Sequence, residues 1–274
     1  YEGTGADARV IPSGGAISWT SDGYFITTKA ALGVANKTYA VILNNGDIFP
    51  IKTVSSDPAS SLVILATDAR GQATVEPIEG KDLRPAQKML LVVNAPAPNQ
   101  TTYLESHIRS GVNSVAGQIF SSDKAQRSVS IQSVGPLTPG QAVFNLDGRL
   151  VGMWDGSTVM AADAIRVFAN NFFRDNLKVM RPGFGFSYKH LSASEARAVQ
   201  LTLGAQVIDV TVGGPSAVAG LQKKDIITSL NGQKVDDETL LETLLAQLKP
   251  GEIATFGVTR NNEMIIVQVT PRQL

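Results

Sequence analysis

Short runs of β-branched and apolar residues, each closed by Gly, Asn, Asp or Pro, repeat along the chain from Gly15 to Gly156. Runs of this length with alternating apolar positions predict strands, and the polar clusters between them predict turns. So many short strands at near-regular spacing favour a barrel or a pair of barrels. The expected strands cover residues 16–19, 24–28, 38–43, 48–54, 62–67, 89–93, 112–118, 129–133, 142–144 and 150–153.

The segment 136–154 predicts a bend followed by a tight hairpin. Asp147 and Gly148 separate two apolar runs, which is the usual sequence signal for a two-residue turn. A loop held by rigid strands is a common position for a catalytic group. Between Ser133 and Ser157, however, the chain has no serine, cysteine or histidine.

After residue 156 the pattern changes to a mixture of helix and strand. Residues 161–173 place Ile165, Phe168 and Phe172 at helical spacing, which predicts an amphipathic helix that closes the first domain. Ser192 and Glu195 form a capping box, so a second helix is expected to begin there. Further expected elements are a helix from 236–238 to the stop signal at 250–251, and strands at 207–212, 226–230, 254–259 and 264–269. We therefore expect a mostly β domain over 1–175 and a small α+β domain over 176–274.

Composition narrows the classes of function. The 274 residues allow two domains with cores of their own. The 24 basic residues equal the 24 acidic ones without any block of like charge, which argues against a nucleic acid or an anionic membrane as partner. The lack of cysteine excludes disulfides, thiolate catalysis and cysteine-bound zinc, and no group of His, Asp and Glu has metal-ligand spacing, so neither a metal nor a cofactor is expected. No apolar run reaches the roughly 20 residues of a membrane span, and Tyr1 at the start is consistent with an export signal or membrane anchor upstream.

Several segments of the first domain, taken in order, resemble the HtrA (Deg-type) serine proteases. Residues 21–27 (SDGYFIT) are similar to the family's DGYILT strand, and residues 56–59 (SDPA) to its DP turn. Residues 109–114 (RSGVNS) are similar to TSGIVS, while 137–140 (LTPG) and 144–148 (FNLDG) bracket the segment that the family writes NPGNSGGPLFN. The resemblance implies a chymotrypsin-like double β-barrel followed by a PDZ domain.

The second domain carries the matching PDZ segments. Residues 183–186 (GFGF), preceded by Arg181, resemble the carboxylate-binding loop of a PDZ domain. Residues 213–221 (GGPSAVAGL) are similar to the family motif GSPAxxAGL. Residues 225–232 (DIITSLNG) are similar to the family motif GDxIxxxNG without its first glycine. Lys224 stands where the family has glycine, and it would cost about 1 kcal/mol if that position needs a positive φ.

The PDZ resemblance implies a peptide-binding groove. Successive N–H groups of the loop would converge on a terminal carboxylate, since glycine lets the backbone approach closely. The strand that follows would offer its edge to an added peptide strand. For Leu244 and Leu248, a place in the core is at least as good an explanation as a place in the groove. The residues assigned to the groove are Arg181, Gly183, Phe184, Gly185, Phe186, Ser187, Tyr188, Leu241 and Leu245.

Transferring the protease motifs residue by residue leaves no member of the catalytic triad. Ala30 takes the place of the histidine and Ser61 that of the aspartate. The nucleophile segment is shortened, so the serine position falls on Pro139 or, with a gap, nearest to Gln141. Acyl transfer by this mechanism needs a hydroxyl, an imidazole that takes its proton and a carboxylate that orients the imidazole. The shortened loop also lacks the glycines of an oxyanion hole. The resemblance therefore implies a protease fold without its chemistry, and not an enzyme.

Substitute catalytic groups are few. The two histidines, His107 and His190, are better explained as surface or partly buried structural residues. Lys29, next to Ala30, would suit a Ser–Lys dyad. Adjacent strand residues point to opposite faces, however, so we expect an exposed lysine that projects away from the triad positions.

Three functional hypotheses remain. The first is a non-catalytic pseudoprotease whose PDZ domain binds extended or C-terminal peptide segments, with a scaffolding or regulatory role or assembly with an active relative. The second is an active peptidase with a relocated nucleophile. The third is a purely structural barrel whose PDZ groove is filled by the chain's own residues. The family resemblance implies export to a bacterial periplasm or cell surface, and a trimer.

Overall fold

The computed structural model describes residues 13–33, 38–94, 101–111, 118–125, 127–132, 135–198 and 200–274. The chain divides into two compact units. Unit 1 consists of Tyr1–Asp57, Ser61–Ser114 and Arg127–Asn170, and unit 2 consists of Pro58–Ser60, Val115–Gln126 and Asn171–Leu274. Unit 2 thus takes in two stretches from the first half of the chain, whereas the expected domains 1–175 and 176–274 are each continuous.

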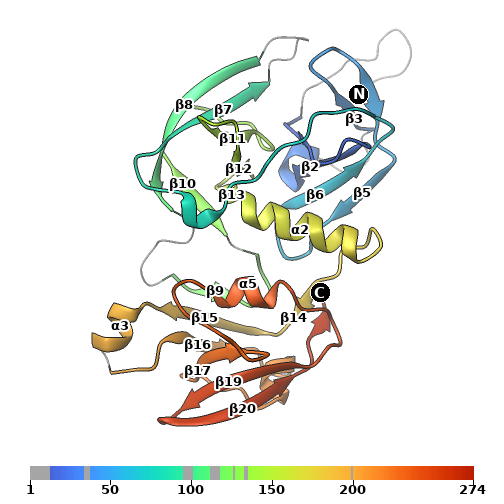
Figure 1. The fold of residues 1–274 in the computed structure, drawn as a ribbon. Coiled ribbons are helices and arrows are strands. Elements are labelled where there is room, and N and C mark those ends of the chain that lie inside the picture. The colour runs from blue at the N-terminus through green and yellow to red at the C-terminus, as the bar shows by residue number, and fades with distance from the viewer. Residues whose placement is uncertain are drawn as a thin grey trace. The chain divides into compact units, whose positions relative to one another are not determined.

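Unit 1 is built mainly of short strands, as the repeating apolar runs predict (Figure 1). They form a four-stranded sheet in the order β1-β2-β6-β5, a β3-β4 hairpin and a closed barrel in the order β10-β13-β12-β11-β7-β8. The sheet and hairpin comprise β1 Ile17–Ser18, β2 Tyr24–Thr28, β3 Ala40–Ile42, β4 Ile48–Pro50, β5 Thr53–Ser56 and β6 Leu62–Ala66. The barrel comprises β7 Lys88–Asn94, β8 Thr101–Ser110, β10 Ser128–Ile131, β11 Ala142–Asn145, β12 Leu150–Trp154 and β13 Val159–Ala161.

Each of these two parts of unit 1 has its own apolar core. In the first, Phe25 of β2 and Leu65 of β6 pack with Val41 of the β3-β4 hairpin. In the second, Met89 of β7 and Val143 of β11 belong to a cluster that fills the closed barrel. Strand β6 (LVILA) is wholly apolar and almost fully buried, whereas β2 (YFITT) also buries the polar residues Thr27 and Thr28.

Strand β8 is the main element of unit 1 that the sequence pattern did not predict. Its sequence is TTYLESHIRS, and only one face of the strand is covered. Ser106 and Ile108 on that face are buried, while Tyr103 on the other face is 58% exposed. The polar residues on its exposed face make it resemble a loop. The strand expected at 112–118 lies, except for its last residue, outside the described residues.

Helix α2, Ala162–Arg174, confirms the helix expected at 161–173. Its predicted apolar stripe is fully buried, with Ile165, Phe168 and Phe172 exposing 0%, 1% and 4% of their surface. Among the helices of the described residues, none is both long and apolar enough to cross a membrane.

The described residues of unit 2 form a seven-stranded sheet and three short helices (Figure 1). Six strands follow the order β20-β19-β17-β16-β15-β9, and β18 pairs with β17. The strands are β9 Phe120–Ser121, β15 Phe186–Leu191, β16 Gly204–Val210, β17 Ile226–Leu230, β18 Gln233–Lys234, β19 Ala254–Arg260 and β20 Glu263–Val269. A separate pair joins β14 Pro182–Gly183 to β21 Arg272–Gln273, and the helices are α3 Ala193–Ala198, α4 Pro215–Val218 and α5 Leu241–Leu245.

Helix α5 begins later than the sequence predicts. The acidic run 236–238 was expected to start it, but α5 starts at Leu241. The Asp236 carboxylate instead accepts hydrogen bonds from the N–H groups of Glu238 and Thr239, at 3.1 and 2.9 Å. Such Asx turns compete with helix formation, which is why an acidic residue can mark a turn as readily as a helix start.

For unit 2, one local prediction is confirmed and one open condition is met. Ser192 Oγ accepts the N–H of Glu195 at 3.2 Å, and Glu195 Oε2 accepts the N–H of Ser192 at 3.0 Å, which is the reciprocal capping box at the start of α3. Lys224 has a φ of 76°, so this position does require the left-handed conformation that glycine adopts without strain.

The Lys224 conformation predicts an unusual stabilisation. Lys224→Gly should raise the free energy of unfolding by about 0.5–1 kcal/mol, because the relief of left-handed strain exceeds the entropy that glycine adds to the unfolded chain. Lys223→Gly is the matched control, since Lys223 is exposed and has no positive φ, and it should lower stability. Urea unfolding of both variants tests this, and a loss of stability in both would contradict it.

Candidate functional site

The positions expected to hold a catalytic triad lie in unit 1 and come from three separated segments. Ala30 sits in the single helical turn α1, Lys29–Leu32, directly after β2. Ser61 precedes β6, and its carbonyl accepts the N–H of Lys29 at 2.7 Å. This hydrogen bond holds the first two segments side by side.

The third segment is the bend at Pro139, Gly140 and Gln141. Gly140 donates its N–H to Trp154 O at 2.7 Å, and Trp154 donates its N–H to Gln141 O at 2.8 Å. The Gln141 side chain is 3% exposed, and its Oε1 accepts the N–H of Thr138 at 2.8 Å. The amide of Gln141 is therefore used to hold the bend.

The three segments meet at the turn Asp155-Gly156. A Cβ built on Gly156 would lie 3.6 Å from Ala30 Cβ and 3.8 Å from Pro139 Cγ. Ser61 Oγ donates to Asp155 Oδ2 at 3.1 Å. The structure thus brings the expected positions together, and it adds Asp155, which the sequence reasoning missed because 94 residues separate it from Ser61.

The groups gathered at this turn differ from those of a proteolytic triad. Ala30 offers a methyl group, and the hydroxyl of Ser61 is bound to a carboxylate. The other oxygen of that carboxylate, Asp155 Oδ1, accepts hydrogen bonds from the backbone and hydroxyl of Ser157 and from the backbone of Thr158. A Ser–carboxylate pair lacks the imidazole that accepts and returns a proton near neutral pH.

The remaining titratable candidates lie elsewhere. His107 is partly buried in β8, opposite Lys88 of β7. His190 lies in β15 of unit 2, where its Nε2 is 2.6 Å from Glu242 Oε2. Within the described ranges, no group of three His, Cys, Asp or Glu residues is placed to hold a metal ion.

Lys29 is exposed, as expected, but for a different reason. It starts a helical turn, so the alternation of a strand does not apply to it. Its Nζ donates to the carbonyl of Asp57 at 2.6 Å, and Asp57 itself is fully buried. The ammonium group therefore stabilises the turn before β6.

A close approach of two backbones fixes the bend. Gly15 donates its N–H to Pro139 O at 2.9 Å, and a Cβ on Gly140 would overlap the carbonyl of Gly15. Gly140 also has a φ of 82°, which favours glycine. The bend thus needs glycine for both space and conformation.

A pair of glycine variants distinguishes the requirement for space from the requirement for a positive φ. Gly148→Ala should cost about 1 kcal/mol of stability, since its φ is 78° but a Cβ there meets no atom within 4 Å. Gly140→Ala should cost roughly 1–3 kcal/mol more, because the added methyl overlaps the Gly15 carbonyl. Thermal and urea unfolding measure both, and equal losses would show that the Gly15 contact does not constrain the bend.

The second expected site, in unit 2, begins at Arg181. Arg181 is 5% exposed, and its carbonyl accepts the N–H of Leu274 at 3.0 Å. A Cβ on Gly183 would overlap the side chain of Leu274. Phe184 and Phe186 are buried against Phe256, with ring centroids 5.8 and 6.1 Å apart. The two phenylalanine side chains thus belong to the core and anchor the loop.

The N–H groups of this loop have acceptors from the same chain. Asp123 Oδ1 accepts the N–H of Phe184 at 2.8 Å and that of Gly185 at 2.9 Å. Ser122 Oγ accepts the N–H of Phe186 at 3.0 Å. The acceptor at the loop is therefore the side-chain carboxylate of Asp123.

The edge of β15 is also occupied, which corrects the expectation that it is open. Strand β9 pairs with it antiparallel, with Ser121 opposite Ser187 and Phe120 opposite Tyr188. Ser122 continues the pairing by donating its N–H to Phe186 O at 2.9 Å. Figure 1 shows β9 beside β15 and close to α5.

The leucines of α5 form part of a continuous core. Leu241, Leu244 and Leu245 are all buried in one cluster that also contains Phe120 and Tyr188. The sequence assigned Leu241 and Leu245 to the groove and left Leu244 to the core, but all three are buried. The position of Phe120 in this cluster was missed, since no short-range pattern links it to residues after 184.

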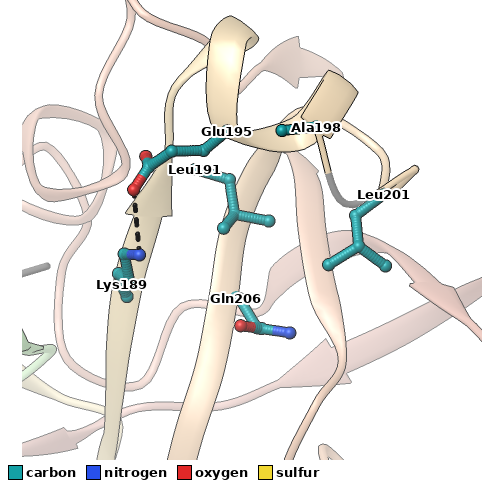
Figure 2. Close-up of a pocket in the computed structure, with 6 residues that line it drawn as sticks. All are labelled: Lys189, Leu191, Glu195, Ala198, Leu201 and Gln206. Atoms are coloured by element: carbon teal, nitrogen blue, oxygen red, sulfur yellow. Dashed lines mark hydrogen bonds and ion pairs between the residues drawn. The ribbon is translucent and has the colours of Figure 1, made fainter.

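A shallow pocket of about 320 Å³ lies between β15, β16 and α3 (Figure 2). Lys189 Nζ and Glu195 Oε1 are 3.0 Å apart there. The N–H of Ser192, followed by the Lys189 ammonium, holds the pKa of Glu195 at about 2, below its usual 4.5. The residues that line the pocket are Lys189, Leu191, Glu195, Ala198, Leu201 and Gln206.

Comparisons with known proteins agree with this architecture. The PDZ domain family matches residues 182–270. The chain is 30% identical to the periplasmic pH-dependent serine endoprotease DegQ of Escherichia coli K12, over 93% of this chain and 58% of that protein. It is 25% identical to a probable periplasmic DegP-like serine endoprotease of Halomonas elongata, over 98% of this chain and 58% of that protein. The chain thus spans less than two thirds of these relatives.

Solved structures show the same fold. The HtrA-type protease AlgW with a tripeptide superposes with a TM-score of 0.69 at 19% identity, covering 94% of this chain and 88% of that one. AlgW with a decapeptide gives a TM-score of 0.66 at 19% identity, covering 96% and 83%. These likenesses confirm the predicted fold class, a mostly β, chymotrypsin-like protease fold with a PDZ domain. The chain is a homologue of the HtrA/Deg-type serine proteases that carries a PDZ domain at residues 182–270.

Proposed function

We propose that this chain is a non-catalytic pseudoprotease that binds extended or C-terminal peptide segments through its PDZ domain. The observation that carries the proposal is the loop Phe184–Gly185–Phe186, whose N–H groups converge on a carboxylate and its neighbouring hydroxyl. Convergent backbone N–H groups form an anion site, and the edge of β15 beside them pairs with an extended segment. Carboxylate capture and strand addition together are what a C-terminal peptide requires.

The residues around Asp155-Gly156 support the non-catalytic part of the proposal. Ala30, Ser61 and Pro139 meet at the place where the homologous motifs put the triad, yet they supply a methyl group, a carboxylate-bound hydroxyl and a pyrrolidine ring. Gln141 uses its amide within the bend. The scaffold of the site is kept while the groups needed for acyl transfer are replaced.

The setting of the protein is proposed from its relatives. The matched relatives are named periplasmic, which supports a place in the bacterial periplasm or on an outward-facing membrane anchor. The AlgW structures hold peptides, which supports a peptide or a protein segment as partner and a scaffolding or regulatory role. The same proposal includes a division of the chain into a protease-like domain over 1–175 and a PDZ domain over 176–274. It also includes a homotrimer and assembly with an active HtrA-type relative.

A second candidate function is an active endopeptidase with a relocated nucleophile, which the serine endoprotease names of the relatives favour. Ser61 is the serine at the triad positions, and its hydroxyl already has a carboxylate partner. This candidate requires Ser61, or another serine, to be reactive.

A fluorophosphonate probe distinguishes the two functions. We expect no covalent labelling of the wild-type protein under conditions that fully label trypsin, because the hydroxyl of Ser61 is bound to a carboxylate and not to an imidazole that could deprotonate it. Intact mass spectrometry reads the adduct, and Ser61→Ala is the matched control. A stoichiometric adduct that disappears in Ser61→Ala would overturn the pseudoprotease proposal.

A further inference from the structure

We infer that the β9 segment, residues 119–125, is an internal ligand that occupies the peptide groove of unit 2, so that a peptide from outside binds only after this segment leaves. The inference rests on the proposed function of the groove. It names the occupant, the chemistry that a competitor needs and the way in which binding is regulated.

The direction of the β9 segment is that of a bound C-terminal peptide. β9 runs antiparallel to β15, and therefore its following residues approach the beginning of β15, where the loop N–H groups lie. Asp123 arrives at that point and presents its carboxylate to Phe184 and Gly185. A side-chain carboxylate thus takes the place of a chain terminus, and the backbone turns away after it.

The carboxylate is the most specific contact. Asp123 Oδ1 accepts two backbone N–H groups at 2.8 and 2.9 Å, and Ser122 Oγ also donates to it at 2.7 Å. Hydrogen bonds to an ionised acceptor are roughly twice as strong as neutral ones. The same Ser122 hydroxyl accepts the N–H of Phe186, so all three loop donors are satisfied by two neighbouring residues.

An aromatic side chain supplies the apolar contact. Phe120 is 6% exposed, stacks on Tyr188 at 5.7 Å between ring centroids and meets His190 edge-on at 5.5 Å. It shares the core cluster with Leu241 and Leu245 of α5. Ile119, one position earlier, is 54% exposed. Successive side chains of an extended segment point to opposite faces, so Phe120 is the side chain that this segment buries in the groove.

The β9 segment is tied at both ends to the chain. In sequence it lies between β8 and β10, and these two strands pair with each other, with Ser110 opposite Ser130. A tethered ligand acts at an effective concentration of roughly millimolar for short flexible connections. The apparent affinity for a free peptide falls by the fraction of molecules in which the groove is open. An effective competitor is therefore an extended C-terminus with an aromatic residue three positions before its carboxylate.

Competition binding tests the inference with a probe copied from the chain. The probe is fluorescently labelled Gln-Ile-Phe-Ser-Ser-Ala with a free C-terminal carboxylate, and the same peptide with a C-terminal amide is its control. Asp123→Asn preserves shape but removes the charge, and should tighten probe binding by about tenfold because the internal ligand loses charge-assisted hydrogen bonds. The double variant Phe120→Ala/Asp123→Asn should bind more tightly still. Asp82→Asn, the same change at an exposed carboxyl of unit 1, should bind like wild type.

Amide hydrogen exchange of Phe184, Gly185 and Phe186, followed by NMR, reads the groove directly. We expect slow exchange in wild type, fast exchange in the double variant and slow exchange again when the probe is added. Equal exchange in wild type and both variants, or equal probe affinity in all three, would overturn the inference. Fast exchange in the double variant without any probe binding would keep the internal occupant but refute peptide binding as the function of the groove.

Discussion

Three successive backbone N–H groups, those of Phe184, Gly185 and Phe186, need acceptors, and this requirement organises unit 2. The two phenylalanine rings are buried against Phe256, so the loop cannot turn its N–H groups inward. Leaving such donors unpaired costs about as much as a lost hydrogen bond. Asp123 and Ser122 satisfy all three, and in doing so they bring β9 to the edge of β15. A segment from the middle of the chain thereby becomes part of the second unit.

In unit 1, the segments expected to carry a catalytic triad are held together at the turn Asp155-Gly156. The close approach of Gly15 and Gly140 and the paired hydrogen bonds of Trp154 hold the bend at Pro139 rigidly. Ser61 and Asp155 are held as well, at 3.1 Å. Such rigidity positions a catalytic group well when one is present. Here it positions Ala30 and the side chain of Gln141, whose Oε1 accepts a hydrogen bond within the bend.

Local signals predicted much of this structure, and long-range pairing explains what they missed. The capping box at Ser192, the left-handed Lys224 and the buried stripe of α2 each depend on residues within a few positions of one another. Strand β8 was missed because half of its residues face solvent, and α5 began late because Asp236 closes a turn.

Phe120 and Asp123 meet partners more than sixty residues away in sequence, as in the 61-residue separation of Asp123 and Phe184. Periodicity in a sequence carries no information on such contacts. The sequence allowed the hypothesis that the chain's own residues fill the PDZ groove, but it did not identify those residues.

The proposed function, taken for both sites together, is a protein that holds peptide segments and does not cleave them. The most direct measurement of this claim is peptide-bond hydrolysis by the variant whose groove is opened, Phe120→Ala/Asp123→Asn, with unfolded casein as substrate and mass spectrometry of new amino termini as readout. This variant removes the internal ligand as a possible reason for inactivity. We expect no new termini above those formed in buffer alone. New termini that form at a rate proportional to protein concentration, and that vanish when Ser61→Ala is added to the same variant, would contradict the claim.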